Sequence, residues 1–279
     1  MISIKLNNLL SPHPSASLEY WFFKVNSGPV ALLVDWIVRR NTQQNWLRVS
    51  IHSPSKREVL SERLFEIMPG DNFLGLQHTS GHLGDIAWEL DIDPGVDLIK
   101  PDLFPAGLLR MADLLLVSAP LARFSGWIRH GEQQFTVQGS PGMISHYWGR
   151  QLASQWWWIS ANQFDQEGVS VECSFFHTSL WATPIISPFA YLYLRQQDKK
   201  ELVMAPFGMA TVQGTPENFK LEIKRIGKEP VTLTGTGREY RELGDGIVNT
   251  LTGDLEIRIG KKLIARAQGT AGLERRAPI

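Results

Sequence analysis

The most informative segment of this chain is Gln155-Trp156-Trp157-Trp158-Ile159-Ser160-Ala161-Asn162-Gln163-Phe164. In a β-strand, successive side chains point to opposite faces, so three consecutive tryptophans cannot share one face. Trp157 then lies on one face, and the other face carries Trp156, Trp158, Asn162 and Phe164. Large aromatics on both faces indicate two apolar layers, one of them the inside of a barrel. The stretch therefore predicts a β-protein with an aromatic-lined apolar cavity.

Composition places the chain among ordinary globular proteins. It has 279 residues, of which 43% are hydrophobic and 20% charged, with a formal net charge of zero and 10 tryptophans. This length allows one large or two small domains, each with a proper core. Because no basic excess is present, no electrostatic footprint for nucleic acid appears, and we expect no nucleic-acid partner.

Cysteine usage and the first residues bear on location. The single cysteine, Cys173, excludes an intramolecular disulfide and lies in an apolar run, which predicts a buried inert thiol. Met1–Asn8 lacks the pattern of a signal peptide, and no run of about 20 apolar residues predicts a spanning helix. We expect a cytoplasmic protein, with peripheral membrane contact left open; the sequence gives no indication of oligomeric state.

Strand-length apolar runs alternate with Gly, Pro, Asn and Asp along most of the chain. The predicted strands are Leu18–Val25, Val30–Val38, Asn45–His52, Phe124–His130, Gln133–Gln138, Trp156–Phe164, Val169–Phe176, Tyr191–Arg195, Leu202–Pro206, Phe219–Arg225, Val231–Thr234, Leu255–Ile259 and Leu263–Gln268. The best helix candidate is Ala106–Leu116, whose period is ambiguous. The pattern predicts an all-β fold.

The chain also contains a weak internal repeat. A hairpin with a Gly-rich exit at residues 128–142 reappears at 257–272, and the aromatic run at 20–23 reappears at 156–158, each roughly 130 positions later. Chance likeness between two hairpins is the alternative. A duplication predicts two β-domains, 1–148 and 149–279. Each has enough strands to curl into a barrel that holds a small ligand, although two sandwiches would also fit.

Two motifs carry a family resemblance. The segment 18–25 has an acidic residue followed by aromatics, at Glu19, Trp21 and Phe22, and the segment 145–149 has a His-x-Trp-Gly pattern. From about residue 18 to 272 the chain resembles the superfamily of tocopherol cyclases, carotenoid 1,2-hydratases and lipocalin-like Diels–Alderases. The resemblance implies two tandem lipocalin-like β-barrel domains packed together. It also implies a cofactor-free cyclase, hydratase or pericyclase that acts on a hydrophobic isoprenoid or polyene.

Such chemistry needs an apolar pocket and, for protonation of a double bond, an acid that stays protonated near neutral pH. Glu19 is the first candidate, because it shares a strand face with Trp21 and Phe23. The alternative is that Glu19 anchors an arginine or backbone amides. Asp35, which interrupts an apolar strand, is placed among the substrate-binding residues; a buried carboxylate there must be protonated or paired, unless it faces solvent.

His146 is the second catalytic candidate, as a proton shuttle or as a donor to a substrate carbonyl; a structural role in the loop fits equally. Asn162 either orients a polar ligand group or ties two strands together. We assign substrate binding to Trp21, Asp35, Trp156, Trp158, Asn162 and Phe164.

We expect neither a metal nor a cofactor. His78 and His82 have helical metal-ligand spacing, but their Gly-containing polar context indicates a loop, and no carboxylate–histidine set completes a zinc site. A non-catalytic carrier of a hydrophobic metabolite is the main alternative to an enzyme, because one fold serves both functions.

Overall fold

The computed structural model describes residues 9–54, 56–64, 71–99, 114–149, 153–179, 186–206 and 208–277. Its secondary structure is almost entirely β-strand, which confirms the all-β prediction. The described residues divide into two compact units, one of residues up to 99 with 114–149, the other of residues 153–277. The expected boundary between residues 148 and 149 falls one residue before the end of the last strand of the first unit.

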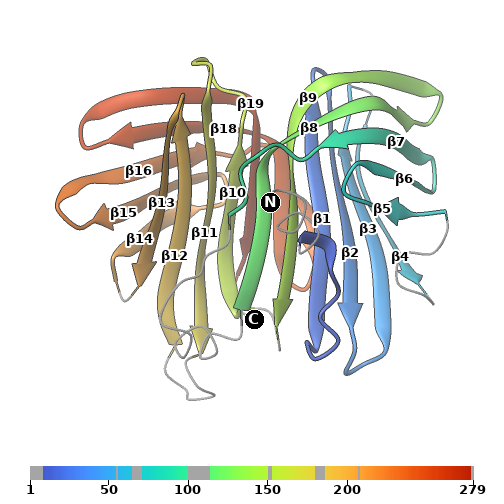
Figure 1. Cartoon of the computed structure of the whole chain (residues 1–279), viewed down its shortest axis with the longest axis horizontal. Helices are drawn as coiled ribbons and strands as arrows, with labels where there is room; N and C mark the ends of the chain where they lie inside the picture. Colours follow the sequence, from blue (N-terminus) through green and yellow to red (C-terminus); the bar gives the residue numbers. More distant parts are fainter. Residues whose placement is uncertain are drawn as a thin grey trace. The chain divides into compact units, whose positions relative to one another are not determined.

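The first unit is one nine-stranded antiparallel sheet in the order β4-β3-β2-β1-β9-β8-β7-β6-β5 (Figure 1, blue to green). Among the described residues the edge strands β4 and β5 are not paired with each other, so the sheet is not the closed barrel that we expected. Its strands are β1 (Leu18–Ser27), β2 (Val30–Arg39), β3 (Gln44–His52), β4 (Arg57–Leu64), β5 (Phe73–Leu74), β6 (His78–Leu83), β7 (Ile86–Asp93), β8 (Leu114–His130) and β9 (Gln133–Gly149).

The second unit is a ten-stranded sheet in the order β13-β12-β11-β10-β19-β18-β16-β15-β14, with β17 paired to β18. This order repeats that of the first unit strand for strand, apart from the added β17, as a duplicated plan requires. Its strands are β10 (Gln155–Ala161), β11 (Val169–Ser179), β12 (Ile186–Gln196), β13 (Lys199–Pro206), β14 (Ala210–Thr215), β15 (Asn218–Arg225), β16 (Lys228–Thr236), β17 (Arg241–Gly244), β18 (Ile247–Ile259) and β19 (Lys262–Arg276).

Alternation along each strand separates the core from the opposite face. In β2 the core cluster of the first unit takes every second residue from Val30 to Val38, and Asp35 lies on the other face. In β10, Trp157 and Ile159 enter the core of the second unit, so Trp156 and Trp158 lie on the opposite face, as predicted.

The predicted strand Trp156–Phe164 is three residues too long. Strand β10 ends at Ala161. Beyond it, the Asp165 N–H donates to the Arg266 carbonyl at 2.8 Å and draws the chain toward β19. Phe164 consequently packs against the core cluster of the second unit, on the side of Trp157. The expectation that Phe164 continues the Trp156 face of this strand is therefore wrong, and Asn162 is the first residue after the strand.

The other differences lie in polar and irregular segments. The sequence missed β4, β5, β6, β7, β14 and β17, which are short or carry many polar residues. Of the candidate helix at 106–116, residues 106–113 lie outside the described part of the chain, and residues 114–116 begin strand β8.

Gly126 provides a test of the β7–β8 pairing. It lies at a β-bulge in β8, its φ is 142°, and a Cβ there would overlap the backbone oxygen of Glu89. Gly126→Ala is expected to lower the free energy of unfolding by more than about 2 kcal/mol, because a ladder carbonyl must move. Gly139→Ala is the control: φ is 56° but nothing lies within 4 Å, so about 1 kcal/mol is expected. Equal losses in urea denaturation would contradict this packing.

Candidate functional site

The two motifs of the resemblance meet across the β1–β9 pair. In this register Glu19 is opposite Trp148, and Trp21 is opposite His146. All four side chains lie on the face that carries the core cluster of the first unit. Glu19 and His146 are far apart in sequence but form one polar cluster between two tryptophans, where β1 begins and β9 ends.

Glu19 is the centre of the cluster. Its side chain is fully buried, and three donors converge on its carboxylate. The backbone N–H of His13 donates to Oε1 at 2.6 Å, and His146 Nε2 lies 3.3 Å from the same oxygen. The guanidinium of Arg40 donates to Oε2. The carboxylate is therefore paired with an arginine and a backbone amide, which was the structural alternative for this residue.

These donors decide the charge of Glu19. Burial by itself raises the pKa of Glu19, but the hydrogen bonds from His146, the His13 backbone and Arg40 outweigh burial and leave the pKa below its ordinary value. Glu19 is consequently ionised at neutral pH. The hydrogen bonds to Glu19 thus oppose the effect of burial, on which the expectation of a protonated carboxyl depended.

His146 lies between the two tryptophans. Its side chain is fully buried, and its ring stacks on Trp21 with centroids 4.7 Å apart, while Trp148 lies 4.7 Å away on a tilted plane. Burial lowers the pKa of His146 most strongly, although Glu19 and the Leu9 backbone favour the protonated ring. The ring is therefore neutral near pH 7.

The partner of Nε2 fixes the tautomer of His146. A carboxylate only accepts hydrogen bonds, so Nε2 carries the proton and Nδ1 presents a lone pair. Nδ1 is buried and has no hydrogen-bond partner among the described residues. The pair is thus a neutral imidazole oriented by a carboxylate, and the lone pair of Nδ1 is buried.

The segment before β1 covers the pair. The ring of His13 stacks on Trp148 with centroids 3.9 Å apart, and Leu9 is buried in the core of the first unit. Arg40 holds the segment in place, because its Nη1 donates to the Ala16 carbonyl at 3.0 Å. The pair therefore lies one side chain below the surface, behind the partly buried His13.

The lowered pKa values of the histidines in this site predict that the protein becomes less stable as the pH falls. The folded pKa values of His146 and His13 lie below the ordinary 6.5, so the unfolded chain binds more protons once the pH falls below about 6.5. Stability is expected to decrease through that range, and the lowered pKa of Glu19 extends the loss below 4.5. Urea midpoints between about pH 8 and about pH 5 measure the slope. His146→Gln should flatten it; an unchanged slope would contradict a buried neutral imidazole.

The remaining predicted residues lie on the other face of the first sheet or in the second unit. Asp35 is buried on the opposite face of the first sheet and accepts from Arg48 Nε at 2.7 Å; burial raises its pKa, and Arg48 opposes the rise. Trp156 belongs to the second unit, where its Nε1–H donates to Glu274 at 2.8 Å. Trp158 is buried on the same face, and Asn162 follows the end of β10.

Sequence reasoning missed His13 and Arg40. His13 lies in a proline-flanked segment before β1, and Arg40 lies in the β2–β3 turn. Neither position has a periodic signal. The prediction for Cys173 is met, because its side chain is buried and burial raises the pKa of the thiol. No helix within the described ranges is long and apolar enough to cross a membrane.

The comparisons with known proteins concern the fold. No protein-family model and no curated protein sequence matches the chain. A solved Nitrosomonas europaea protein, provisionally designated AttH, is similar with a TM-score of 0.65 and 13% identity over 96% of this chain and 94% of that one. Kievitone hydratase from Nectria haematococca is similar with a TM-score of 0.62 and 11% identity, and the match covers 96% of this chain and 90% of the hydratase. The structure of CghA with Sch210972 is similar with a TM-score of 0.63 and 11% identity, and the match covers 93% of this chain and 88% of CghA.

These likenesses define the class of fold. At such identities they show the architecture alone, and that architecture is all-β and lipocalin-like. The resemblance that the sequence motifs indicated is thereby confirmed at the level of the fold.

Proposed function

We propose that the protein is an enzyme that adds water to, or cyclises, a hydrophobic isoprenoid or polyene, with His146 as the proton-transferring group. The observation that carries the proposal is the buried His146–Glu19 pair, held between two tryptophans with Nδ1 unpartnered. Two neighbours in fold support the reaction class: one is named a hydratase, and CghA is a Diels–Alderase.

The pair suits proton transfer in both directions. In a hydration, the imidazole first takes a proton from solvent at Nδ1, and the imidazolium then donates it to one carbon of a double bond. Water captures the resulting cation at the neighbouring carbon, and the proton that this water loses returns to Nδ1. Glu19 stabilises the imidazolium, because it already accepts from Nε2. The net change is the addition of one water molecule.

The surroundings suit an apolar substrate. Trp21 and Trp148 offer π-faces beside the imidazole, and such faces stabilise positive charge that develops on a carbon skeleton. Beyond Trp21 the interior is occupied by aromatic side chains, with Phe23 packed on Phe124 at 5.5 Å between centroids. We therefore place substrate entry on the His13 side. Trp21 keeps its predicted substrate-binding role in this proposal. Asp35 lies on the opposite face of the sheet and has no part in it. The assignment of Trp156, Trp158, Asn162 and Phe164 to substrate binding stays a prediction.

The test is product analysis with the purified full-length protein. Linear polyenes and prenylated phenols are incubated in water enriched in heavy oxygen, and the products are separated and weighed by mass spectrometry. Hydration gives a water adduct that carries the heavy isotope, and cyclisation gives an isomer with a new retention time. Compounds that bind but are recovered unchanged would contradict the enzyme proposal and favour a carrier.

A further inference from the structure

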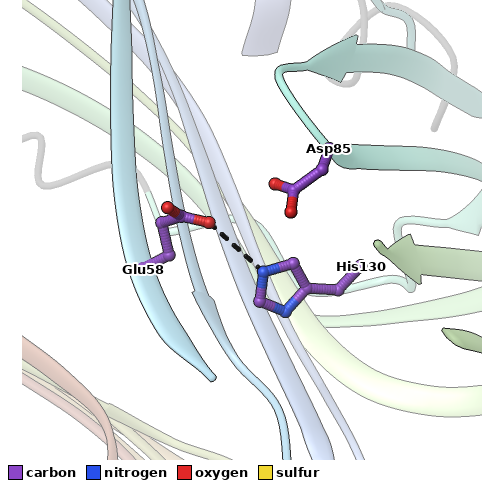
Figure 2. Close-up of side chains that lie close together, drawn as sticks. All are labelled: Glu58, Asp85 and His130. Carbon is purple, nitrogen blue, oxygen red and sulfur yellow. Dashed lines mark hydrogen bonds and ion pairs between the residues drawn. The ribbon is translucent and has the colours of Figure 1, made fainter. Parts of the chain in front are cut away.

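A second polar cluster in the first unit lies at the ends of three hairpins. It consists of Glu58 in β4, Asp85 in the β6–β7 turn and His130 at the end of β8, and Figure 2 shows the three side chains directed toward a common point. One ligand-type atom from each lies within 4.8 Å of the others. The proposed reaction uses none of these residues.

His130 is held by a hydrogen bond on its far side. Its Nδ1 lies 2.9 Å from Ser53 Oγ, and the side chain of His130 is almost fully buried. Ser53 Oγ donates to the Lys56 carbonyl at 3.0 Å, so it can accept from Nδ1–H. In that tautomer Nε2 presents a lone pair to the cluster, which is the arrangement of a metal-binding histidine with an outer hydrogen-bond partner.

The spacing of the first two ligands fits a small divalent ion. His130 Nε2 lies 3.3 Å from Glu58 Oε2. Two ligands of a tetrahedral ion with bonds of about 2.0–2.1 Å lie about 3.3 Å apart. Without an ion, Nε2–H can donate across this distance to the carboxylate, and a divalent cation would take the place of that proton. Lys56 Nζ is bound to the other oxygen, Oε1, at 2.6 Å. Asp85 is exposed on a turn, so it can approach as the third ligand.

We infer that Glu58, Asp85 and His130 form a binding site for a divalent cation of the Zn²⁺ type. One imidazole nitrogen with two carboxylates suits a borderline ion of this kind, whereas Mg²⁺ and Ca²⁺ prefer oxygen ligands throughout. Three protein ligands leave a fourth position for water.

The ion would join distant parts of one sheet. Strand β4 is an edge strand, and β8 lies five places away in the sheet order. Leu60 of β4 nevertheless reaches the β6–β7 turn, where a Cβ at Gly84 would lie 2.8 Å from its Cδ1. Metal binding is therefore expected to stabilise the curved first unit by fixing its free edge.

The test uses the full-length protein after treatment with a chelator. Zn²⁺ is titrated by calorimetry, and thermal unfolding is followed with and without the ion. We expect one ion per chain and a higher unfolding temperature with Zn²⁺. Asp85→Asn is expected to weaken Zn²⁺ binding at least about tenfold, and Ser53→Ala about 10–100-fold through loss of the outer partner.

The matched control is Asp91→Asn. Asp91 pairs with His78 at 3.2 Å on β6 and β7, but this pair belongs to no group of three possible ligands in the described part of the chain. The control should bind Zn²⁺ like the wild type. The inference is overturned if no Zn²⁺ binds, or if Asp85→Asn and Ser53→Ala bind Zn²⁺ as tightly as the wild type, or if Asp91→Asn removes the binding. Because Asp85 is exposed, circular dichroism of the Asp85→Asn protein should show an intact fold.

Discussion

His146→Gln is expected to reduce turnover by roughly 10²–10⁴-fold, the usual contribution of a general acid or base. Glutamine retains a donor toward Glu19 but has no titratable nitrogen to accept and return a proton. The assay is the rate of formation of the product found in the heavy-oxygen experiment. The loss should appear in kcat rather than in KM, because the tryptophan faces beside the substrate remain.

A histidine outside the site provides the control for this effect. His82 lies exposed on β6, and His82→Gln should leave the rate unchanged. If His146→Gln alters the rate by less than about twofold, His146 transfers no proton, and the protein acts by shaping the substrate alone.

Glu19→Ala is expected to cost about 3 kcal/mol in the free energy of unfolding. Removing one partner of a buried ion pair usually costs about 3–5 kcal/mol, because the other charge stays buried without compensation. Arg40 keeps 26% of its side-chain surface exposed and can turn toward water, so the lower end of that range applies. The backbone N–H of His13 also loses its acceptor. Urea denaturation measures the change.

A double-mutant cycle separates the pair from the rest of the network. Arg40→Ala alone leaves a buried carboxylate with two donors, His13 and His146. The double variant Glu19→Ala/Arg40→Ala should be more stable than the sum of the two single losses predicts, because the pair acts as a unit. Strict additivity would contradict the ion pair as the element that holds the segment before β1.

The fold could be predicted from sequence wherever alternation is strong. The apolar runs of β2 and β11 specify strands with one core face, and the Trp156–Trp158 run specified side chains on both faces of β10. The end of β10 could not be predicted in this way. The apolar pattern continues to Phe164, and only the backbone pairing between Asp165 and Arg266 shows where the strand stops.

The candidate site could be predicted only in part. Glu19 and His146 are 127 positions apart, and their residue types came from motifs rather than from periodicity. The charge of Glu19 depends on His13 and Arg40, which lie outside regular strands. The Glu58–Asp85–His130 cluster combines the ends of three hairpins. The residue pattern along any single strand does not predict that these ends lie close together.

The proposed proton transfer requires that His146 is a neutral imidazole with its proton on Nε2 and a lone pair on Nδ1. The most direct measurement is a nitrogen-15 NMR titration of the histidine side chains, with His146 assigned by comparison with His146→Gln. We expect the Nε2–H tautomer at neutral pH and a pKa of His146 below the ordinary 6.5. A doubly protonated ring at neutral pH, or a proton on Nδ1 instead of Nε2, would contradict it.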